Sequence, residues 1–129
     1  MTERPILGIT MGDPSGAGPE IVTKAWADPK MHAIARMVAI GDAATLAQAF
    51  RITGAPGTVR AISSVSEARF EPGTLDVIDL HDVDLAQLQF AKVQAMAGQA
   101  AYDAVEKGVR LALAGEIDAL VTSALNKEA

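Results

Sequence analysis

The segment ILGITMGDPSGAGPE, residues 6–20, joins a short apolar run to a glycine-rich loop and the start of a helix. The run is rich in β-branched residues and ends at a turn, which predicts a buried strand over residues 6–11. Pro19 suits the first position of a helix, and Glu20 adds a favourable negative charge to its first turn. We therefore predict a strand, a tight loop and a helix that stops before Asp28.

The alternation of strand and helix continues along the chain. Asp42 is expected to cap a second helix that ends near Gly54, and Gly115 should end a longer helix that begins between residues 95 and 98. The apolar stripe predicted for the longer helix comprises Ala97, Ala101, Val105, Val109 and Ala112. Further strands are predicted over residues 36–40, 58–62, 75–80 and 118–122, with turn signals at residues 71–73.

This pattern favours a single α/β domain over residues 1–129 with a mainly parallel sheet. Hydrophobic residues make up 50% of the chain and aromatic residues 4%, so the core must consist of Ala, Val, Ile and Leu. Such a composition is typical of a buried parallel sheet covered by Ala-rich helices. Because ligands of these sheets gather at the carboxyl edge, the loop after the first strand and the segment after the last strand are expected to share one site.

Charge and cysteine content exclude several classes of function. The net charge of −5 and the absence of a Lys/Arg cluster argue against nucleic acid or an anionic membrane surface as a partner. The chain has no cysteine, which excludes disulfides, thiolate catalysis and Cys-based zinc sites. No apolar stretch matches a signal-peptide core or a membrane span, so we expect a soluble cytoplasmic protein.

The loop over residues 12–18 could approach an anion closely, because its glycines permit positive φ angles and the next helix presents free N–H groups. It is not a P-loop, since no Gly-Lys-Ser/Thr follows, and it lacks the Gly-x-Gly-x-x-Gly spacing of a Rossmann fingerprint. One interpretation is a substrate-binding loop in which Asp13 and Ser15 contact the substrate. The other is a tight turn in which Asp13 or Ser15 caps the backbone.

Residues 9–21, ITMGDPSGAGPEI, closely resemble the opening of the 4-hydroxythreonine-4-phosphate dehydrogenase family. They are similar, more distantly, to the Gly-Asp-Gly-x-Gly-Pro-Glu opening of isopropylmalate and isocitrate dehydrogenases. A second match comprises GQAAY at 98–102, GEIDALVT at 115–122 and LNKEA at 125–129, in the order and separation of that family. The chain thus resembles the amino-terminal part of a family member.

The resemblance implies an isocitrate/isopropylmalate dehydrogenase-like fold within a larger, homodimeric two-domain enzyme. Such enzymes use NAD and a divalent metal (Zn, Mg, Mn or Co) to oxidise a phosphorylated four-carbon hydroxy acid, which then loses carbon dioxide. Substrates implied by the resemblance are 4-phosphohydroxy-L-threonine, 4-phospho-D-threonate and 4-phospho-D-erythronate. The metal ligands and most cofactor contacts are expected beyond Ala129, so this chain alone is expected to be inactive.

By position, Asn126 and Lys127 match the substrate-contacting pair of the family. Lys127 could bind a carboxylate or phosphate, or assist proton transfer as the catalytic residue, and Asn126 could donate to a substrate oxygen. The alternative is a solvated lysine beside a helix-capping asparagine. The family usually has Pro where Ala124 stands. Pyridoxine-pathway members often have His at the position of Asn126, which tilts the substrate towards a sugar acid.

Three other candidate features are interpreted as structural. Trp26 lies on the apolar face of the first predicted helix and is expected in the core. His32 follows a proline closely and is expected at the surface. The segment His81-Asp82-Val83-Asp84 carries metal-compatible side chains without a recognised ligand spacing, so a solvated loop is expected.

Two other classes of function stay open. A non-catalytic phosphate-binding or dimerisation module would use the glycine loop and Lys127 without the metal ligands. A phosphotransacetylase-like transferase would share the general fold, although the opening segment resembles the dehydrogenases better. For the isolated chain we also expect an exposed apolar face and self-association.

Overall fold

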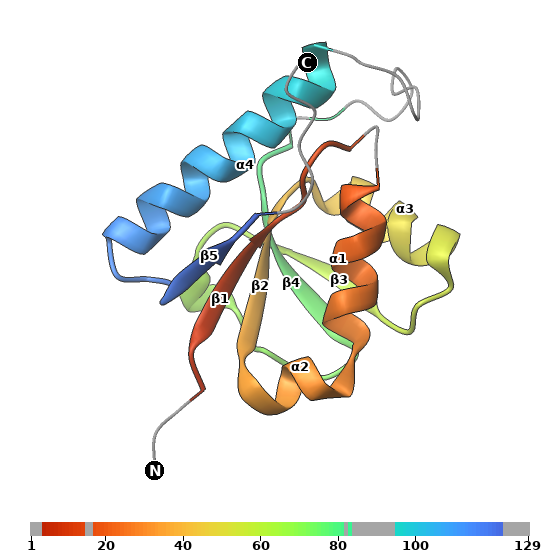
Figure 1. The fold of residues 1–129 in the computed structure, drawn as a ribbon, viewed down its shortest axis with the longest axis vertical. Coiled ribbons are helices and arrows are strands. Elements are labelled where there is room, and N and C mark those ends of the chain that lie inside the picture. Colours follow the sequence, from red (N-terminus) through yellow and green to blue (C-terminus); the bar gives the residue numbers. More distant parts are fainter. Residues whose placement is uncertain (1–3, 15–16, 82, 84–94, 123–129) are drawn as a thin grey trace.

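The computed structural model describes residues 4–14, 17–81, 83 and 95–122 (Figure 1). In this part of the chain, strands and helices alternate as the sequence predicts. The strands are β1 Ile6–Thr10, β2 Arg36–Gly41, β3 Thr58–Ile62, β4 Thr74–Asp79 and β5 Ala119–Val121. The helices are α1 Gly18–Ala27, α2 Pro29–Ile34, α3 Ala43–Thr53 and α4 Ala95–Leu113, with a short 3-10 turn, η1, at Val65–Glu67.

The five strands form one sheet in the order β3-β4-β2-β1-β5, and every pairing between neighbours is parallel. The α/β class and the parallel sheet are therefore confirmed. β1 lies between β2 and β5, with Ile9 opposite Ala39 on one side and Val121 on the other. This order places the carboxyl ends of β1 and β5 next to each other.

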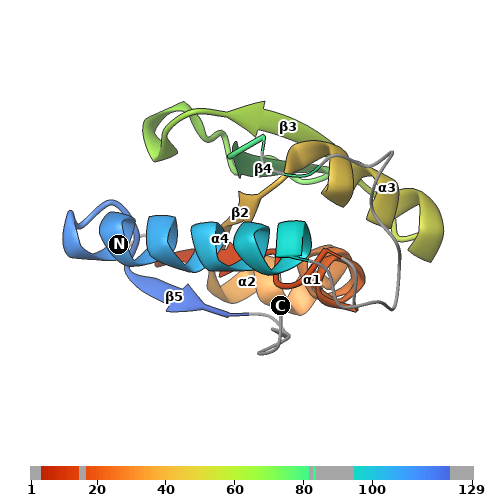
Figure 2. The same ribbon diagram turned by 90° about the horizontal axis from the view of Figure 1, so that it is seen from above.

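Helices cover both faces of the sheet (Figure 2). On one face, α1 and α3 contact each other and bury Trp26, Leu46 and Phe50 against the sheet. On the other face, α4 packs on β1, β2 and β5 and contributes Ala104 and Leu111 to a second apolar cluster. Burying a large aliphatic or aromatic side chain stabilises a fold by roughly 1.5–3 kcal/mol, so these two clusters hold the layers together.

Local signals set the ends of α3 as predicted. The Asp42 carboxylate accepts a hydrogen bond from the Thr45 backbone N–H at 3.0 Å, and this satisfies one of the free donors at the start of the helix. Gly54 adopts a φ of 70°, in the left-handed region that ends many helices. Both residues act as the sequence indicates.

The short helix α2 is not among the predicted elements. Asp28 caps it by accepting a hydrogen bond from the Lys30 backbone N–H at 2.9 Å, and Pro29 occupies its first position. Its six residues include no buried side chain. A helix of this length without a buried face shows no apolar periodicity, which explains why pattern analysis misses it.

The predicted apolar stripe of α4 is correct at Ala97 and Ala101, which are buried, and wrong towards the carboxyl end of the helix. Val109 is 44% exposed and Ala112 is also exposed. The helix instead turns a face of smaller residues to the sheet, namely Ala97, Ala100, Ala101, Ala104, Gly108 and Leu111. A Cβ atom at Gly108 would lie 2.4 Å from Leu120 Cδ1 and 3.3 Å from Ile40 Cδ1. The helix therefore approaches the sheet closely at Gly108, and the predicted stripe departs from the buried face after Ala101.

The buried carboxylate of Asp76 on β4 links this strand to β3 and to the turn at residues 69–70. Sequence reasoning did not identify this link. Asp76 is 2% exposed, and its Oδ1 accepts hydrogen bonds from Arg60 Nε at 3.0 Å and Nη2 at 2.7 Å. Its Oδ2 accepts from the backbone N–H groups of Arg69 and Phe70, at 3.1 and 2.9 Å. Since Phe70 has a φ of 53°, the carboxylate holds a turn that few non-glycine residues adopt.

None of the helices among the described residues combines the length and the apolar character needed to cross a membrane.

Replacing Asp76 with Asn should destabilise the fold strongly, because an amide has one acceptor oxygen and would turn its NH₂ group towards other donors. We expect the free energy of unfolding to fall by about 3 kcal/mol, measured by urea denaturation. Asp103→Asn is the matched control, because that carboxylate accepts a hydrogen bond from Gln99 at the surface. Its effect should stay within about 0.5 kcal/mol, and equal effects of the two changes would contradict the role given to Asp76.

Candidate functional site at the carboxyl edge of the sheet

The loop after β1 leaves the sheet at its carboxyl edge, the upper edge in Figure 1. Met11 is completely buried, and its backbone N–H donates to the Ile40 carbonyl at 2.9 Å, which extends the pairing of β1 with β2. Gly12 then takes a φ of 79° and turns the chain. The strand, the turn and the following helix thus have the predicted arrangement.

Close backbone packing shapes this loop. A Cβ atom at Gly18 would lie 2.5 Å from the Met11 carbonyl oxygen and 3.2 Å from Gly12 Cα. Both neighbours are backbone atoms, so no side-chain rotation could relieve the contact. Glycine is therefore required where α1 begins, because the helix start packs directly on the strand exit.

The amino end of α1 faces the same edge. The helix begins at Gly18 with Ala17 as the N-cap, so Pro19 occupies the second helical position, one residue later than predicted. The Ile21 backbone N–H bonds the Ala17 carbonyl at 3.0 Å, which closes the first turn. Pro19 has no N–H group, so the first turn leaves the backbone N–H groups of Gly18 and Glu20 without an acceptor inside the helix. The start of a helix can bind an anion through such groups.

The predicted site residues are described only in part. Asp13 lies three residues after the end of β1 and is 5% exposed. Ser15, Asn126 and Lys127 lie outside the described residues, so the contacts assigned to them stay predictions. The strands that lead to them are described: β1 and β5 are parallel neighbours, and Leu7, Gly8 and Ile9 pair with residues 119–121. The expectation that both strands end at one edge is confirmed.

A second helix start at this edge is already occupied by protein carboxylates. Asp42 caps α3, and Asp79 at the end of β4 accepts a hydrogen bond from the Ala43 backbone N–H at 3.1 Å. Asp79 also lies 3.2 Å from His81 Nε2, and the His81 side chain is 82% exposed, in keeping with a solvated position. Two carboxylates at the start of α3 would repel an incoming anion. The start of α1, by contrast, has no side-chain cap.

The contribution of Asp79 could not be identified by local pattern. Asp42 directly precedes its helix and fits the N-cap preference, whereas Asp79 reaches the same helix from a different strand. The spatial pairing of β2 with β4, in which Gly41 lies opposite Asp79, brings the two together. Among the residues that the structure describes, no group of three His, Asp or Glu side chains could hold a metal ion.

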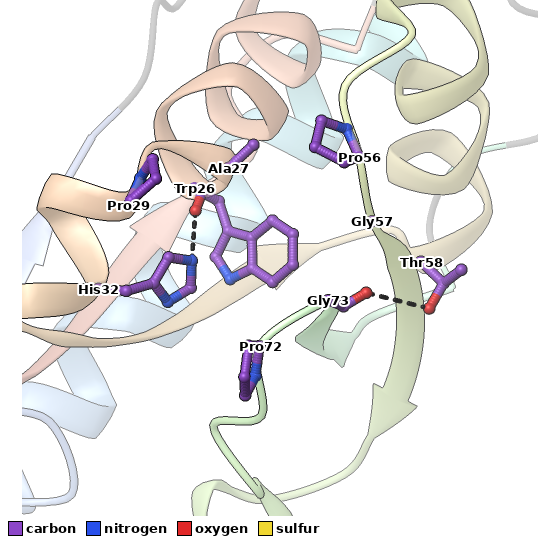
Figure 3. Close-up of a pocket in the computed structure, with 9 residues that line it drawn as sticks. All are labelled: Trp26, Ala27, Pro29, His32, Pro56, Gly57, Thr58, Pro72 and Gly73. Carbon is purple, nitrogen blue, oxygen red and sulfur yellow. Dashed lines mark hydrogen bonds between the residues drawn. The ribbon is translucent and has the colours of Figure 1, made fainter.

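An apolar pocket lies at the opposite, amino edge of the sheet (Figure 3). It has a volume of about 490 Å³, and its walls come from the end of α1, from α2 and from the segments before β3 and β4. Its lining residues are Trp26, Ala27, Pro29, His32, Pro56, Gly57, Thr58, Pro72 and Gly73. The pocket is separate from the glycine loop and took no part in the predicted site.

Trp26 and His32 form one wall of this pocket. Trp26 is 3% exposed and packs edge-on against Phe50 at a centroid distance of 5.6 Å, so its predicted place in the core is confirmed. His32 is only half-buried, yet its ring packs against Trp26 and its Nε2 is hydrogen bonded to the Trp26 carbonyl. The expected surface position of His32 is thus only partly correct, because α2 folds it back onto α1.

Comparisons with known proteins agree with this architecture. The family model described as "Pyridoxal phosphate biosynthetic protein PdxA" matches residues 33–129. The D-threonate 4-phosphate dehydrogenase of Cupriavidus necator is 45% identical over 125 residues, which are 97% of this chain and 37% of that protein.

Solved structures match as well. A crystal structure of a 4-hydroxythreonine-4-phosphate dehydrogenase from Burkholderia phymatum superposes with a TM-score of 0.95 at 44% identity, covering 98% of this chain and 38% of that one. The enzyme of that name from Klebsiella pneumoniae gives a TM-score of 0.88 at 36% identity, with coverages of 98% and 38%. The chain therefore spans well under half the length of these relatives. Because the family model covers most of the sequence and the fold coincides with these structures, the chain belongs to the PdxA family of pyridoxal phosphate biosynthetic proteins.

Proposed function

We propose that this chain supplies the amino-terminal part of a dehydrogenase that oxidises a phosphorylated four-carbon hydroxy acid. The observation that carries the proposal is the match, along almost the whole chain, to proteins named D-threonate 4-phosphate dehydrogenase and 4-hydroxythreonine-4-phosphate dehydrogenase. Both names describe a phosphorylated substrate with a four-carbon skeleton and an oxidisable alcohol. Oxidation would be followed by loss of carbon dioxide.

The carboxyl edge of the sheet would bind the anionic substrate. The start of α1 offers backbone N–H groups that the helix itself does not use and the positive end of the helix dipole, and glycine allows a close approach at the loop. Lys127 follows β5, which ends beside β1. We assign Lys127 to a substrate phosphate or carboxylate and to proton transfer, and Asn126 to a substrate oxygen. Asp13 and Ser15 are assigned to substrate contacts from the loop after β1.

The proposal includes NAD as hydride acceptor, a divalent metal, a homodimeric assembly and a cytoplasmic location, all on the strength of the family resemblance. The described residues do not fit a metal, because no three of their acidic or histidine side chains converge. We therefore assign no catalytic step in this part of the chain to a metal. The contribution of these residues is to bind and orient the substrate anion.

NADH formation tests the proposed activity. D-threonate 4-phosphate and 4-phosphohydroxy-L-threonine are each supplied with NAD and Mg²⁺, Mn²⁺ or Zn²⁺, and NADH absorbance is followed. The assay uses this chain and, where the coding sequence continues past Ala129, the longer polypeptide. We expect turnover from the longer polypeptide and none from the 129 residues alone. A longer polypeptide that binds these phosphates without reducing NAD would refute a dehydrogenase.

Within an active longer polypeptide, Lys127→Met should lower kcat/KM by about a hundredfold, because substrate charge and proton transfer lose their partner. Lys24→Met is the matched control, since Lys24 is exposed on α1. Steady-state kinetics of both variants measure this loss of kcat/KM. Equal kinetics for the two variants would show that Lys127 is solvated and has no role.

Gly18→Ala should distort the loop after β1, because the added Cβ meets the backbone at 2.5 Å. We expect the free energy of unfolding to fall by about 1–3 kcal/mol, and substrate affinity in the longer polypeptide to fall with it. Gly108→Ala should cost less than Gly18→Ala, because the atoms that its Cβ would meet at 2.4 Å belong to the movable end of the Leu120 side chain and alanine favours a helix by about 1 kcal/mol. Urea denaturation that ranks Gly108→Ala as the more damaging change would contradict the packing described for Gly18.

A further inference from the structure

The apolar pocket at the amino edge of the sheet has the size and the lining of a small-molecule site. Its volume of about 490 Å³ lies within the range of roughly 300–1,000 Å³ that is usual for ligand pockets. Its walls are the rings of Trp26 and His32, proline rings and glycine backbone (Figure 3). Among its nine described lining residues, none is Asp, Glu, Lys or Arg. A ligand must therefore be compact, mostly apolar and neutral, because an anion would lose its hydration without gaining a counter-charge.

A buried polar group in the wall gives the pocket one specific requirement. Trp26 is 3% exposed, and its indole N–H donates to no acceptor in the part of the chain that the structure describes. The backbone carbonyl of the same residue, by contrast, is hydrogen bonded to His32 Nε2. A buried donor without an acceptor is unfavourable and rare in folded proteins. A molecule that brings an acceptor to this N–H is therefore bound in preference to one that does not.

The packing of Trp26 turns the indole N–H towards the cavity. One edge of the ring lies against the segment before β3, where a Cβ atom at Gly57 would be 2.5 Å from Trp26 Cζ3. Phe50 packs on the same ring at a centroid distance of 5.6 Å. The indole nitrogen is on the edge opposite Cζ3, and in Figure 3 it lies on the side of Pro72. The unpaired donor thus borders the space between Trp26 and Pro72.

We propose that this pocket binds a neutral ring compound with one hydrogen-bond acceptor, a carbonyl oxygen, which accepts from Trp26 Nε1. The ring of the ligand lies against the prolines, and its burial supplies most of the affinity. The hydrogen bond fixes the orientation of the ligand and completes the bonding of the indole. Since the proposed anion site lies at the other edge of the sheet, the proposal does not rest on the proposed function.

The described chain ends at the edge of the sheet that faces away from this pocket. β5 is parallel to β1 and ends beside it at the carboxyl edge, whereas the pocket is lined by the end of α1, by α2 and by the segments before β3 and β4. Residues that follow β5 therefore start from the opposite edge. A longer polypeptide that returned to fill the pocket would leave no room for a ligand, and the test includes this outcome.

Nuclear magnetic resonance of the indole group tests the proposal. Trp26 is the only tryptophan of the chain, so the single indole N–H resonance belongs to the proposed donor. Acetophenone is the probe, and α-methylstyrene is the matched control, because it has a CH₂ group in place of the carbonyl oxygen. We expect acetophenone to shift the resonance saturably and to bind about fivefold more tightly than the control. Benzoate, which is charged, should bind about tenfold more weakly than acetophenone. The absence of a saturable shift, or equal affinities for acetophenone and α-methylstyrene, would overturn the proposal.

Filling the pocket tests its location. Ala27→Leu adds bulk at the rim between Trp26 and Pro56 (Figure 3), and it should weaken acetophenone binding about tenfold or more. Ala44→Leu is the matched control, since Ala44 is exposed on α3, and it should leave binding unchanged. Circular dichroism checks that both variants fold, and the comparison of the probes on the unaltered chain does not depend on either variant.

The same titrations are made with this chain and, where the coding sequence continues past Ala129, with the longer polypeptide. We expect the longer polypeptide to bind acetophenone with the same preference over α-methylstyrene. Equal binding by folded Ala27→Leu and Ala44→Leu would exclude this pocket as the site. Binding by the 129 residues that is lost in the longer polypeptide would show that protein, and not a ligand, fills the pocket.

Discussion

The parallel pairing of β1 with both β2 and β5 is the constraint on which the rest of the structure depends. β1 pairs with β2 from Ile6 to Thr10 and with β5 from Leu7 to Ile9. Its amino end is further tied by the Asp118 carboxylate, which accepts from the Ile6 backbone N–H at 2.7 Å. Because β1 lies between β2 and β5, the carboxyl ends of β1 and β5 lie at the same edge, and α4 must cross the sheet face to reach β5.

Small residues make this arrangement possible. At Gly8 on β1, an added Cβ would lie 2.7 Å from Ile117 Cδ1, and at Gly41 on β2 it would lie 2.6 Å from Met11 Cβ. With Gly108 on α4 and Gly18 on α1, these positions let helix, strand and loop approach more closely than side chains would allow. The same close packing turns the alanine face of α4 inward and leaves its larger residues outside.

The two edges of the sheet consequently differ in chemistry. At the carboxyl edge, Asp42 and Asp79 hold the start of α3, whereas the start of α1 has no side-chain cap. At the amino edge, Trp26 and proline residues line an apolar pocket, and Asp76 holds the turn at Phe70. We therefore assign the proposed anion site to the carboxyl edge, whereas the described side chains at the opposite edge line an apolar pocket.

The sequence by itself determined the elements and the class of fold. Strand patterns, the Asp42 cap and the glycines at helix ends act over a few residues, so they can be read without a structure, and the glycine loop indicated the family. Only the tertiary structure decided the strand order, the inward face of α4, the fold-back of His32 and the buried network of Asp76. These depend on contacts between residues far apart in the chain, where close approach of backbones and the pairing of buried charges outweigh any local preference. The sheet edge that carries the proposed site could be predicted from the parallel class of the sheet. The hydrogen bond from Ala43 at the start of α3 to Asp79 could not, because it depends on the pairing of β2 with β4.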